Sequence, residues 1–220
     1  MLAKELISYE VPPLSFSTNG ERALQLMEDF KLTEMPIVEG TSYKGLISEA
    51  AILDLESLDS PLKNLQPQLD LTSVTEFEHV YEVIGKMAGK KLSLLPVLND
   101  NKQYLGAITL NILIEKISNL AAMKDPGGIL QLEMNINDYS LSEIANIVES
   151  NGAKIISSYT ITHDDSTKMD VTLKINKTDL SAIIQTFERY NYLVVASFHK
   201  SDFEDDLKRR FDAFIHYLNM

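Results

Sequence analysis

The chain of 220 residues contains no cysteine and no tryptophan. Without cysteine it has neither a disulfide framework nor a thiolate metal site, which is typical of a protein from a reducing compartment. No apolar run approaches the roughly 18 residues that a transmembrane helix needs, and the first residues lack the basic start and apolar core of a signal peptide. We therefore expect a cytoplasmic protein with no membrane partner.

Catalytic motifs are also missing. The sequence has no phosphate-binding glycine loop, no Gly-x-Ser-x-Gly and no His-Glu-x-x-His, so we predict that it is not an enzyme. Among its four histidines only His163, beside Asp164 and Asp165, stands in a run that could hold a metal, and a polar hairpin turn is the favoured interpretation. The formal net charge of -12 disfavours nucleic acid, because nucleic-acid binding depends on neutralising phosphates.

What the chain does contain is an internal repeat. At an offset of 60 positions, residues 35–38 match residues 95–98, and at an offset of 61 positions residues 45–48 match residues 106–109. In both copies an apolar-Pro-apolar-apolar segment precedes a turn, and a Gly-apolar-apolar-hydroxyl segment follows it. Two copies are too few for a solenoid, which needs about three units. We expect a pseudo-two-fold pair whose apolar faces cover each other, with ligand sites in the cleft between the copies.

Each copy predicts the same order: strand, helix, strand, strand, helix. In the first copy, Thr18 and Glu21 have the spacing of a capping box, and Ala23, Met27 and Phe30 follow at helical spacing. A glycine begins the third strand, where a side chain would block a turn or a close approach of the backbone. The predicted strands are 11–16, 35–38 and one from Gly45 in the first copy, and 71–75, 95–98 and one from Gly106 in the second; the closing helices are 49–58 and 111–120.

This unit resembles the CBS domain, and the two copies resemble a tandem CBS pair, or Bateman module, over residues 1–122, with copies at about 1–60 and 61–122. The resemblance implies a regulatory protein that binds a small molecule, such as AMP, ATP or another adenosine ligand, between the copies. The implied ligand-binding residues are two hydroxyls and the backbone around two prolines: Ser48, Thr109, Pro36, Ile37, Pro96 and Val97. The alternatives are helix capping for the hydroxyls and strand-entry geometry for the prolines.

In the CBS family an Asp three residues after the hydroxyl commonly holds the ribose. Here those positions are Ala51 and Ile112, neither of which accepts a hydrogen bond from a ribose diol. Asp54 and Asn111 are the candidate substitutes. A second hypothesis therefore stays open, in which the chain is a ligand-independent dimerisation or interaction adaptor with degenerate pockets. A small basic cluster is interpreted either as a phosphate contact or as a solvated helix end: Lys86, Lys90 and Lys91.

The pattern changes after a turn signal at 123–128, which we predict to be a linker. Residues 129–199 predict a ferredoxin-like βαββαβ unit, which resembles an ACT domain in a chain with CBS repeats. This domain order is similar to that of acetoin-utilisation accessory proteins. The turn where amino-acid-sensing ACT domains carry glycine is 137–139 here and has none, so the alternative role is dimerisation through strand edges. The predicted elements are strands 129–136, 153–162, 169–175 and 193–198, a helix capped by Ser140 and a helix over 179–190.

Residues 201–220 predict a C-terminal helix, with acidic residues in its first turns and basic residues after them. An apolar stripe runs along this helix: Phe203, Leu207, Phe211, Phe214 and Leu218. Three exposed phenylalanines would make a large apolar patch, so we expect the stripe to be buried on its own domain or on a second subunit. The sequence as a whole predicts an α+β protein that forms a homodimer and responds to a small-molecule effector.

Overall fold

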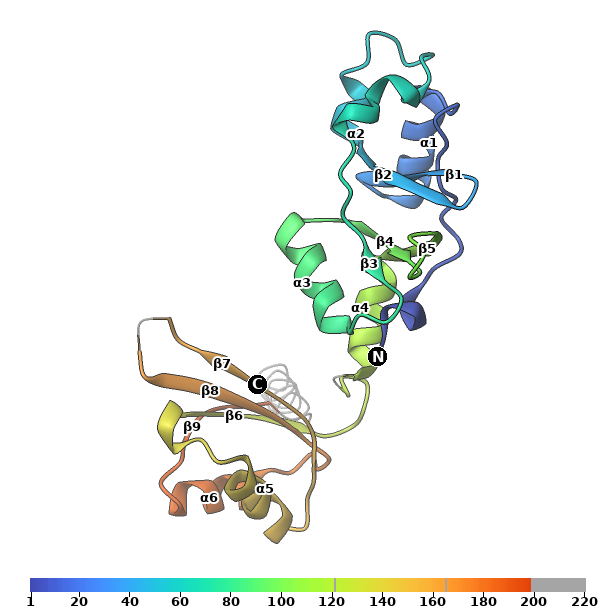
Figure 1. Cartoon of the computed structure of the whole chain (residues 1–220). Helices are drawn as coiled ribbons and strands as arrows, with labels where there is room; N and C mark the ends of the chain where they lie inside the picture. Colours follow the sequence, from blue (N-terminus) through green and yellow to red (C-terminus); the bar gives the residue numbers. More distant parts are fainter. Residues whose placement is uncertain (121, 165, 199–220) are drawn as a thin grey trace, which may run out of the picture. The chain divides into compact units, whose positions relative to one another are not determined.

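The computed structural model describes residues 1–120, 122–164 and 166–198 (Figure 1). These residues form two compact units, Met1–Ile117 and the described part from Ser118 onward. The sheets of both units are mainly antiparallel and carry helices, so the fold class is α+β, as predicted. The helix that we predict over residues 201–220 lies outside the described residues and stays a prediction.

The first unit repeats one motif of helices and a β-hairpin. Two of its elements are 3-10 helices, written η, and strand β3 has only two residues. In chain order the elements are η1 (Ala3–Leu6), α1 (Gly20–Phe30), β1 (Glu34–Glu39), β2 (Ser42–Ser48), α2 (Glu49–Leu53), η2 (Leu62–Gln68), β3 (Val74–Thr75), α3 (Val80–Lys90), β4 (Leu94–Leu98), β5 (Tyr104–Thr109) and α4 (Leu110–Leu120).

The two copies agree in their hydrogen-bond register. Strand β1 pairs antiparallel with β2, β4 pairs antiparallel with β5, and the register shifts directly after Ile37 in one hairpin and after Val97 in the other. A parallel pairing to the preceding segment completes each copy, joining Leu14 to Ile37 and Val74 to Val97. The repeat therefore folds twice into the same motif.

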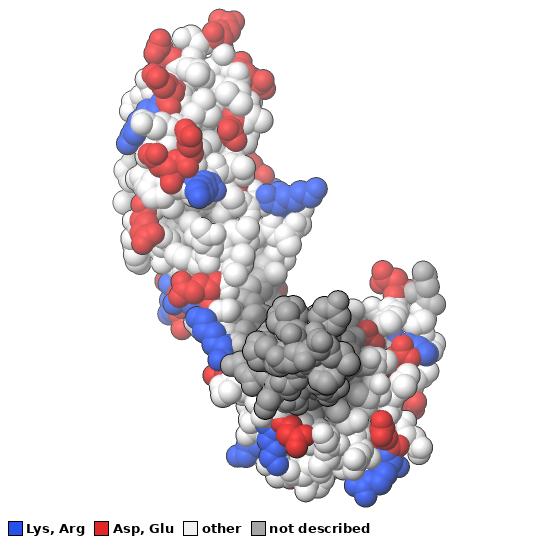
Figure 2. All heavy atoms as spheres, turned by 180° about the vertical axis from the view of Figure 1, so that it is seen from behind, with Lys and Arg blue, Asp and Glu red and all other residues white. Residues whose placement is uncertain are grey.

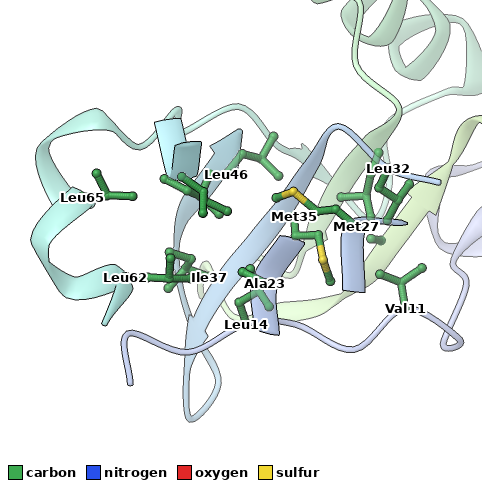
Figure 3. Packing of buried hydrophobic residues seen from close by; sticks show 14 residues of the cluster. Val11, Leu14, Ala23, Met27, Leu32, Met35, Ile37, Leu46, Leu62 and Leu65 are labelled. Atoms are coloured by element: carbon green, nitrogen blue, oxygen red, sulfur yellow. The ribbon is translucent and has the colours of Figure 1, made fainter. Parts of the chain in front are cut away.

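The opening segment of each copy packs against the core of the other copy. The N-terminal segment crosses to the second copy, where Ala3 and Leu6 are fully buried and Ser8 pairs with Ala107. The segment that opens the second copy crosses to the first, where Leu62 and Leu65 enter the core (Figure 3). Each fold therefore needs chain from both repeats, which ties the copies together.

The repeated glycines make this exchange possible. Gly45 and Gly106 both have positive φ, +143° and +151°. A Cβ on Gly45 would lie 2.7 Å from the Cβ of Leu69, and a Cβ on Gly106 would overlap Ile7. The predicted close approach is correct, but the predicted position at a strand start is wrong. Strands β2 and β5 begin three and two residues earlier, at Ser42 and Tyr104, because their hairpin pairing continues toward the turn.

A core of apolar side chains fills each copy. Helix α1 buries Ala23 and Met27 against β1, where Met35 and Ile37 have no exposed surface (Figure 3). In the second copy, α3 buries Val83, the repeat equivalent of Ala23, in the core of that copy. Complete burial of a Met, Leu or Ile side chain stabilises a fold by about 1.5–3 kcal/mol, so these contacts are the main source of stability.

The predicted cap of α1 is one residue out of place. Asn19 is the N-cap, and its Oδ1 accepts the N–H of Arg22 at 2.9 Å. The hydroxyl of Thr18 instead accepts the N–H of Ser15 at 3.1 Å, in the turn before the helix. Thr18 is therefore already engaged in a local turn, and the next polar side chain takes the cap.

The second helix of the first copy is shorter than predicted, since α2 ends at Leu53 and not at residue 58. The chain beyond it turns so that the carbonyls of Leu58 and Ser60 accept the N–H groups of Glu21 and Gly20, at 3.0 and 3.2 Å. The first N–H groups of a helix have no partner within the helix. Capping α1 in this way requires the chain to leave the helical conformation early.

The second unit has one four-stranded sheet and two main helices. The strand order is β7-β8-β6-β9, and all neighbouring strands are antiparallel, which is the ferredoxin-like arrangement that the sequence predicts. Its elements are β6 (Gly128–Asn135), η3 (Ile136–Asp138), α5 (Leu141–Ser150), β7 (Ile155–Thr162), β8 (Lys168–Ile175), α6 (Ser181–Arg189) and β9 (Leu193–Phe198).

Both helices of this unit pack on one side of the sheet (Figure 1). Ser140 caps α5 as predicted, since its hydroxyl accepts the N–H of Glu143 at 3.4 Å. Helix α6 begins two residues later than predicted, because Asp179 accepts the N–H of Ser181 and holds a turn there. The core includes Phe187 with no exposed surface.

Candidate functional site

The strongest candidate site is a hollow between the two copies of the first unit, beside Thr109. It has a volume of about 410 Å³. Its walls come from the N-terminal segment, the end of α1, the start of β4 and the start of α4. The lining residues that bear on recognition are Ser8, Glu10, Asp29, Phe30, Lys31, Ser93, Thr109, Asn111 and Ile112. Both copies contribute, so a ligand here would touch both.

The two predicted hydroxyls both cap helices. Thr109 Oγ1 accepts the N–H of Ile112 at 3.4 Å, and Ser48 Oγ accepts the N–H of Ala51 at 3.2 Å at the start of α2. A hydroxyl that accepts one bond still has a proton to donate. Capping therefore accounts for both residues without removing them as ligand contacts, and their binding role stays a prediction.

The two predicted proline segments lie inside the strands β1 and β4. Pro36 and Pro96 are buried, and Ile37 and Val97 have no exposed surface. The carbonyl of Pro36 accepts the N–H of Leu14 at 2.8 Å, so strand pairing uses part of this backbone. The hollow beside Thr109 is lined by other residues. The adenine slot that the resemblance implies around these prolines stays a prediction.

The candidate substitutes for the missing Asp are separated. Asn111 lines the hollow, beside Ile112, whereas Asp54 ends α2 in the other copy. The structure shows that Asp29 also lines the hollow. The repeat did not reveal Asp29 as a site residue, because the equivalent of Asp29 in the second copy is Gly89. Asp29 and Asn111 therefore offer oxygen acceptors in the hollow, which the side chain of Ile112 does not.

The repeat equivalent of one lining residue of the hollow is a charged side chain. Lys90, the repeat equivalent of Phe30, lies 2.8 Å from the Asp70 carboxylate and also donates to Thr72. Burial alone raises the pKa of Asp70, but hydrogen bonds from Lys90 and Thr72 outweigh it and hold the pKa below its usual range. The two positions related by the repeat therefore differ in chemistry: Phe30 lines the hollow, whereas Lys90 forms an ion pair.

A buried carboxylate joins the two copies next to the hollow. Glu34, at 7% exposure, accepts hydrogen bonds from the Leu94 N–H and the Ser93 hydroxyl, each at 2.9 Å, and from the Ser93 N–H. Its other oxygen accepts the hydroxyl of Thr33 at 2.6 Å. The repeat equivalent of Glu34 is Leu94, so this connection is made once. A charge at an otherwise apolar repeat position was the sequence signal for it.

Two equivalent tyrosines mark the opposite end of the contact between the copies. Tyr104 N–H donates to Thr41 O at 2.9 Å, and the Tyr43 hydroxyl donates to Thr72 O at 2.9 Å. Burial raises the pKa of both tyrosines, so both stay neutral at physiological pH. The Tyr104 hydroxyl is buried without a partner among the described residues.

In the second unit, the turn that bears on amino-acid binding is η3. Asn135 accepts the N–H of Asn137 at 3.0 Å, so the turn is closed by a side chain in place of glycine. A hollow of about 400 Å³ lies beside it, lined by acidic and aromatic residues that include Glu143 and Tyr192. Burial, together with a hydrogen bond to Glu143, raises the pKa of Tyr192 to about 12. Among the described residues, no Lys or Arg lines this hollow to pair with an α-carboxylate.

The remaining predictions concern metals, membranes and charge. Over the described ranges, no group of three His, Asp or Glu side chains is arranged to hold a metal ion, and His163 pairs with Asp170 at 3.2 Å. No helix in these ranges has the length and apolar character to cross a membrane. On the face in Figure 2, acidic and basic side chains of the described residues are interspersed, without a continuous basic area.

Comparison with known families identifies part of the chain. Residues 63–119, which cover most of the second copy, match the family model of the CBS domain. A homoserine O-acetyltransferase from Methanosphaera stadtmanae is 29% identical over 112 residues. That match covers 48% of this chain but only 22% of the enzyme, so the chain spans about a fifth of that relative.

Solved structures with a similar fold align to about half of the chain. A CBS domain pair/ACT domain protein from Thermotoga maritima is 20% identical, with a TM-score of 0.48, and the match covers 54% of this chain and 98% of that one. A Vibrio cholerae protein assigned to acetoin utilization is 23% identical, with a TM-score of 0.48 and coverages of 56% and 95%. The protein CBSX2, solved in complex with AMP, is 17% identical, with a TM-score of 0.42 and coverages of 54% and 96%.

Proposed function

We propose that the first unit, a tandem CBS pair whose second copy matches the family model and whose first copy repeats its fold, is a regulatory module that binds one small molecule beside Thr109. The observation that carries this proposal is the hollow of about 410 Å³ between the copies. Small-molecule pockets usually measure about 300–1,000 Å³, so the hollow suits a nucleoside or a mononucleotide.

The lining chemistry favours AMP among adenosine ligands. Phe30 offers an apolar ring, and the hydroxyls of Ser93 and Thr109 can bond polar groups of the ligand. Asp29 and the amide oxygen of Asn111 can accept hydrogen bonds from a ribose diol in place of the missing Asp. Among the described residues that line the hollow, Lys31 is the one basic side chain and Glu10 and Asp29 are acidic, which suits one phosphate better than the three of ATP.

Regulation follows if the ligand favours one arrangement of the copies. A molecule that touches both copies stabilises the closed arrangement by its difference in affinity for the closed and open states, and by no more. Glu34 already links the copies beside the hollow, so the change needed is small. We further propose that the protein acts as a cytoplasmic homodimer and that its second unit, which has the ferredoxin-like topology of ACT domains, contributes to dimerisation.

The experiment is a thermal-shift panel with AMP, ATP, S-adenosylmethionine and amino acids. A ligand at 100 times its Kd stabilises the fold by about 2.7 kcal/mol, which is readily measured. AMP should give the largest shift. The Thr109→Ala variant should weaken AMP about tenfold, the value of one hydrogen bond of about 1.4 kcal/mol.

Ser48→Ala is the matched control, because it also removes a hydroxyl that caps a helix but lies away from the hollow. Its AMP affinity should equal that of the wild type. Equal losses in the two variants would mean that helix capping, and not ligand contact, causes the effect. No shift with any compound in the panel would contradict the proposal.

A second candidate function is a ligand-independent adaptor. Ala51 and Ile112 at the ribose positions, and the Lys90–Asp70 ion pair at the repeat equivalent of Phe30, favour it. This candidate predicts that the oligomeric state and the thermal stability are the same with and without every compound in the panel.

A further inference from the structure

The polar groups of Ser93, which lines the hollow beside Thr109, are almost fully engaged within the protein. The N–H of Ser93 donates to the Glu34 carboxylate, and its carbonyl accepts the N–H of Leu110 at 2.9 Å. Its hydroxyl donates to Glu34 Oε1 at 2.9 Å and accepts the N–H of Thr33 at 3.0 Å. A hydroxyl has one proton and two lone pairs, so the Ser93 hydroxyl keeps one lone pair for a ligand and no proton.

The carboxylate of Glu34 fixes the direction of this hydroxyl. Its Oε1 also accepts the N–H groups of Ser93 and Leu94, the latter at 2.9 Å, so this oxygen cannot act as a donor toward Ser93. The Thr33 hydroxyl lies 3.4 Å from the Ser93 hydroxyl, but its one proton serves the shorter bond of 2.6 Å to Glu34 Oε2. Glu34 therefore holds the proton of each neighbouring hydroxyl, and the Ser93 proton stays turned away from a ligand.

The repeat does not supply a second carboxylate of this kind. Ser93 is the repeat equivalent of Thr33, and the repeat equivalent of Glu34 is Leu94, whose side chain has no acceptor. None of the ion pairs found among the described residues involves Glu34. A buried carboxylate without a cationic partner depends on its hydrogen bonds, so the donors around Glu34 are committed to it.

Other side chains of the hollow provide both donors and acceptors. Lys31 donates, and the Thr109 hydroxyl still has a proton to donate because its bond to the Ile112 N–H uses a lone pair. Asp29 accepts. In AMP the phosphate requires donors and the ribose diol can donate to Asp29, whereas the 6-amino group of the base is a donor. Matching these polarities leaves the 6-amino group as the partner for the lone pair of Ser93.

We propose that Ser93, held as an acceptor by Glu34, makes the hollow specific for a 6-amino purine. Ser93 accepts a hydrogen bond from the amino group of the base, and Glu34 is a positioning residue that acts through Ser93. A 6-oxo purine presents an oxygen in place of the amino group, so that two acceptors face each other with no proton between them. The inference rests on the proposed AMP site beside Thr109 and deepens it by assigning the base.

The test compares the Kd values of AMP and IMP, measured by isothermal titration of the full-length protein. The wild type should bind AMP about 30-fold more tightly than IMP, since leaving a buried polar group without its partner weakens binding by about 5- to 150-fold. Ser93→Ala removes the acceptor, so this ratio should fall to about threefold. A loss of stability alone would weaken both nucleotides equally and leave the ratio unchanged.

Two variants of Glu34 separate its positioning role from its structural role. Glu34→Ala frees the Ser93 proton, which can then turn and donate to the 6-oxygen of IMP, so the ratio should again fall to about threefold. Glu34→Gln keeps an oxygen where the N–H groups of Ser93 and Leu94 converge, so the preference of about 30-fold should be retained. If Glu34→Ala is too unstable to titrate, Ser93→Ala alone decides the test.

Thr109→Ala is the matched control, because it also removes a hydroxyl from the hollow but one that donates to a part shared by AMP and IMP. It should weaken both nucleotides about tenfold and leave their ratio near 30. A wild-type ratio below about threefold, or an unchanged ratio in Ser93→Ala, overturns the inference and leaves the AMP site intact. No binding of either nucleotide overturns the proposed function and this inference with it.

Discussion

Glu34 offers a sharp test of how the two copies of the first unit are held together. Its carboxylate accepts the N–H groups of Ser93 and Leu94 and the hydroxyl of Ser93. The Leu94 N–H belongs to a residue with no exposed surface, so water cannot replace the carboxylate there without opening the contact. The Glu34→Ala variant removes the acceptor and leaves these donors in place.

The expected loss follows from these contacts. An unsatisfied buried donor costs about 1–3 kcal/mol, and the half-buried Ser93 groups cost less because water reaches them. We expect Glu34→Ala to lower the free energy of unfolding by about 3 kcal/mol. Glu34→Gln keeps an acceptor but loses the charge, which roughly halves the strength of such bonds, so we expect about 1 kcal/mol.

Urea unfolding monitored by circular dichroism and tyrosine fluorescence measures both variants. Glu39→Ala is a useful control, because Glu39 is an exposed acid at the far end of the same strand and, among the described residues, accepts the Phe16 N–H alone. The reasoning is refuted if Glu34→Ala loses less than about 0.5 kcal/mol, or if Glu34→Gln is as damaging as Glu34→Ala.

Further predictions concern the exchanged segments and the ion pair. Gly106→Ala should lower the free energy of unfolding of the first unit by at least about 2 kcal/mol in urea, because the new Cβ would overlap Ile7 and Gly106 has a positive φ. The control Gly85→Ala lies in α3 with open space around it, so it should be neutral or stabilising by up to about 1 kcal/mol. Similar losses in the two variants would disprove the role of the close approach at Gly106. The folded-state pKa of Asp70 is lowered, so its pairing with Lys90 stabilises the fold above the unfolded pKa near 4 and loses that effect as pH falls through the folded value. Wild type and Asp70→Asn should therefore differ in Tm at pH 7 and converge once the pH has fallen below the lowered folded-state pKa of Asp70, and a constant difference would contradict this.

The repeat and the element order could be predicted from sequence because they depend on local periodicity. The match of residues 35–38 to 95–98 reflects two strands buried in the same way, and the structure gives both the same register shift. The ferredoxin-like order followed equally from alternation in β6 and β8 and from the cap at Ser140. Such patterns repeat every two or four residues and survive in a single sequence.

The tertiary pairings could not be predicted. Nothing near Ile7 indicates that it must lie against Gly106, and Lys90 meets Asp70 only after the chain has turned. The early end of α2 likewise depends on α1, whose free N–H groups need the carbonyls beyond it. At the candidate site, the repeated motif predicted the hydroxyl of Thr109. It could not predict Asp29, because Asp29 belongs to the other copy and reaches the hollow only in the folded chain.

The most direct test of the account is an isothermal titration of the full-length chain with AMP. Because Lys90, paired with Asp70, stands at the repeat position where the hollow beside Thr109 has Phe30, the two halves differ in chemistry and we predict one AMP per chain. Thr109→Ala should weaken this binding about tenfold, and Ser48→Ala should leave it unchanged. Two equivalent sites per chain, or no heat of binding at millimolar AMP, would contradict the central claim.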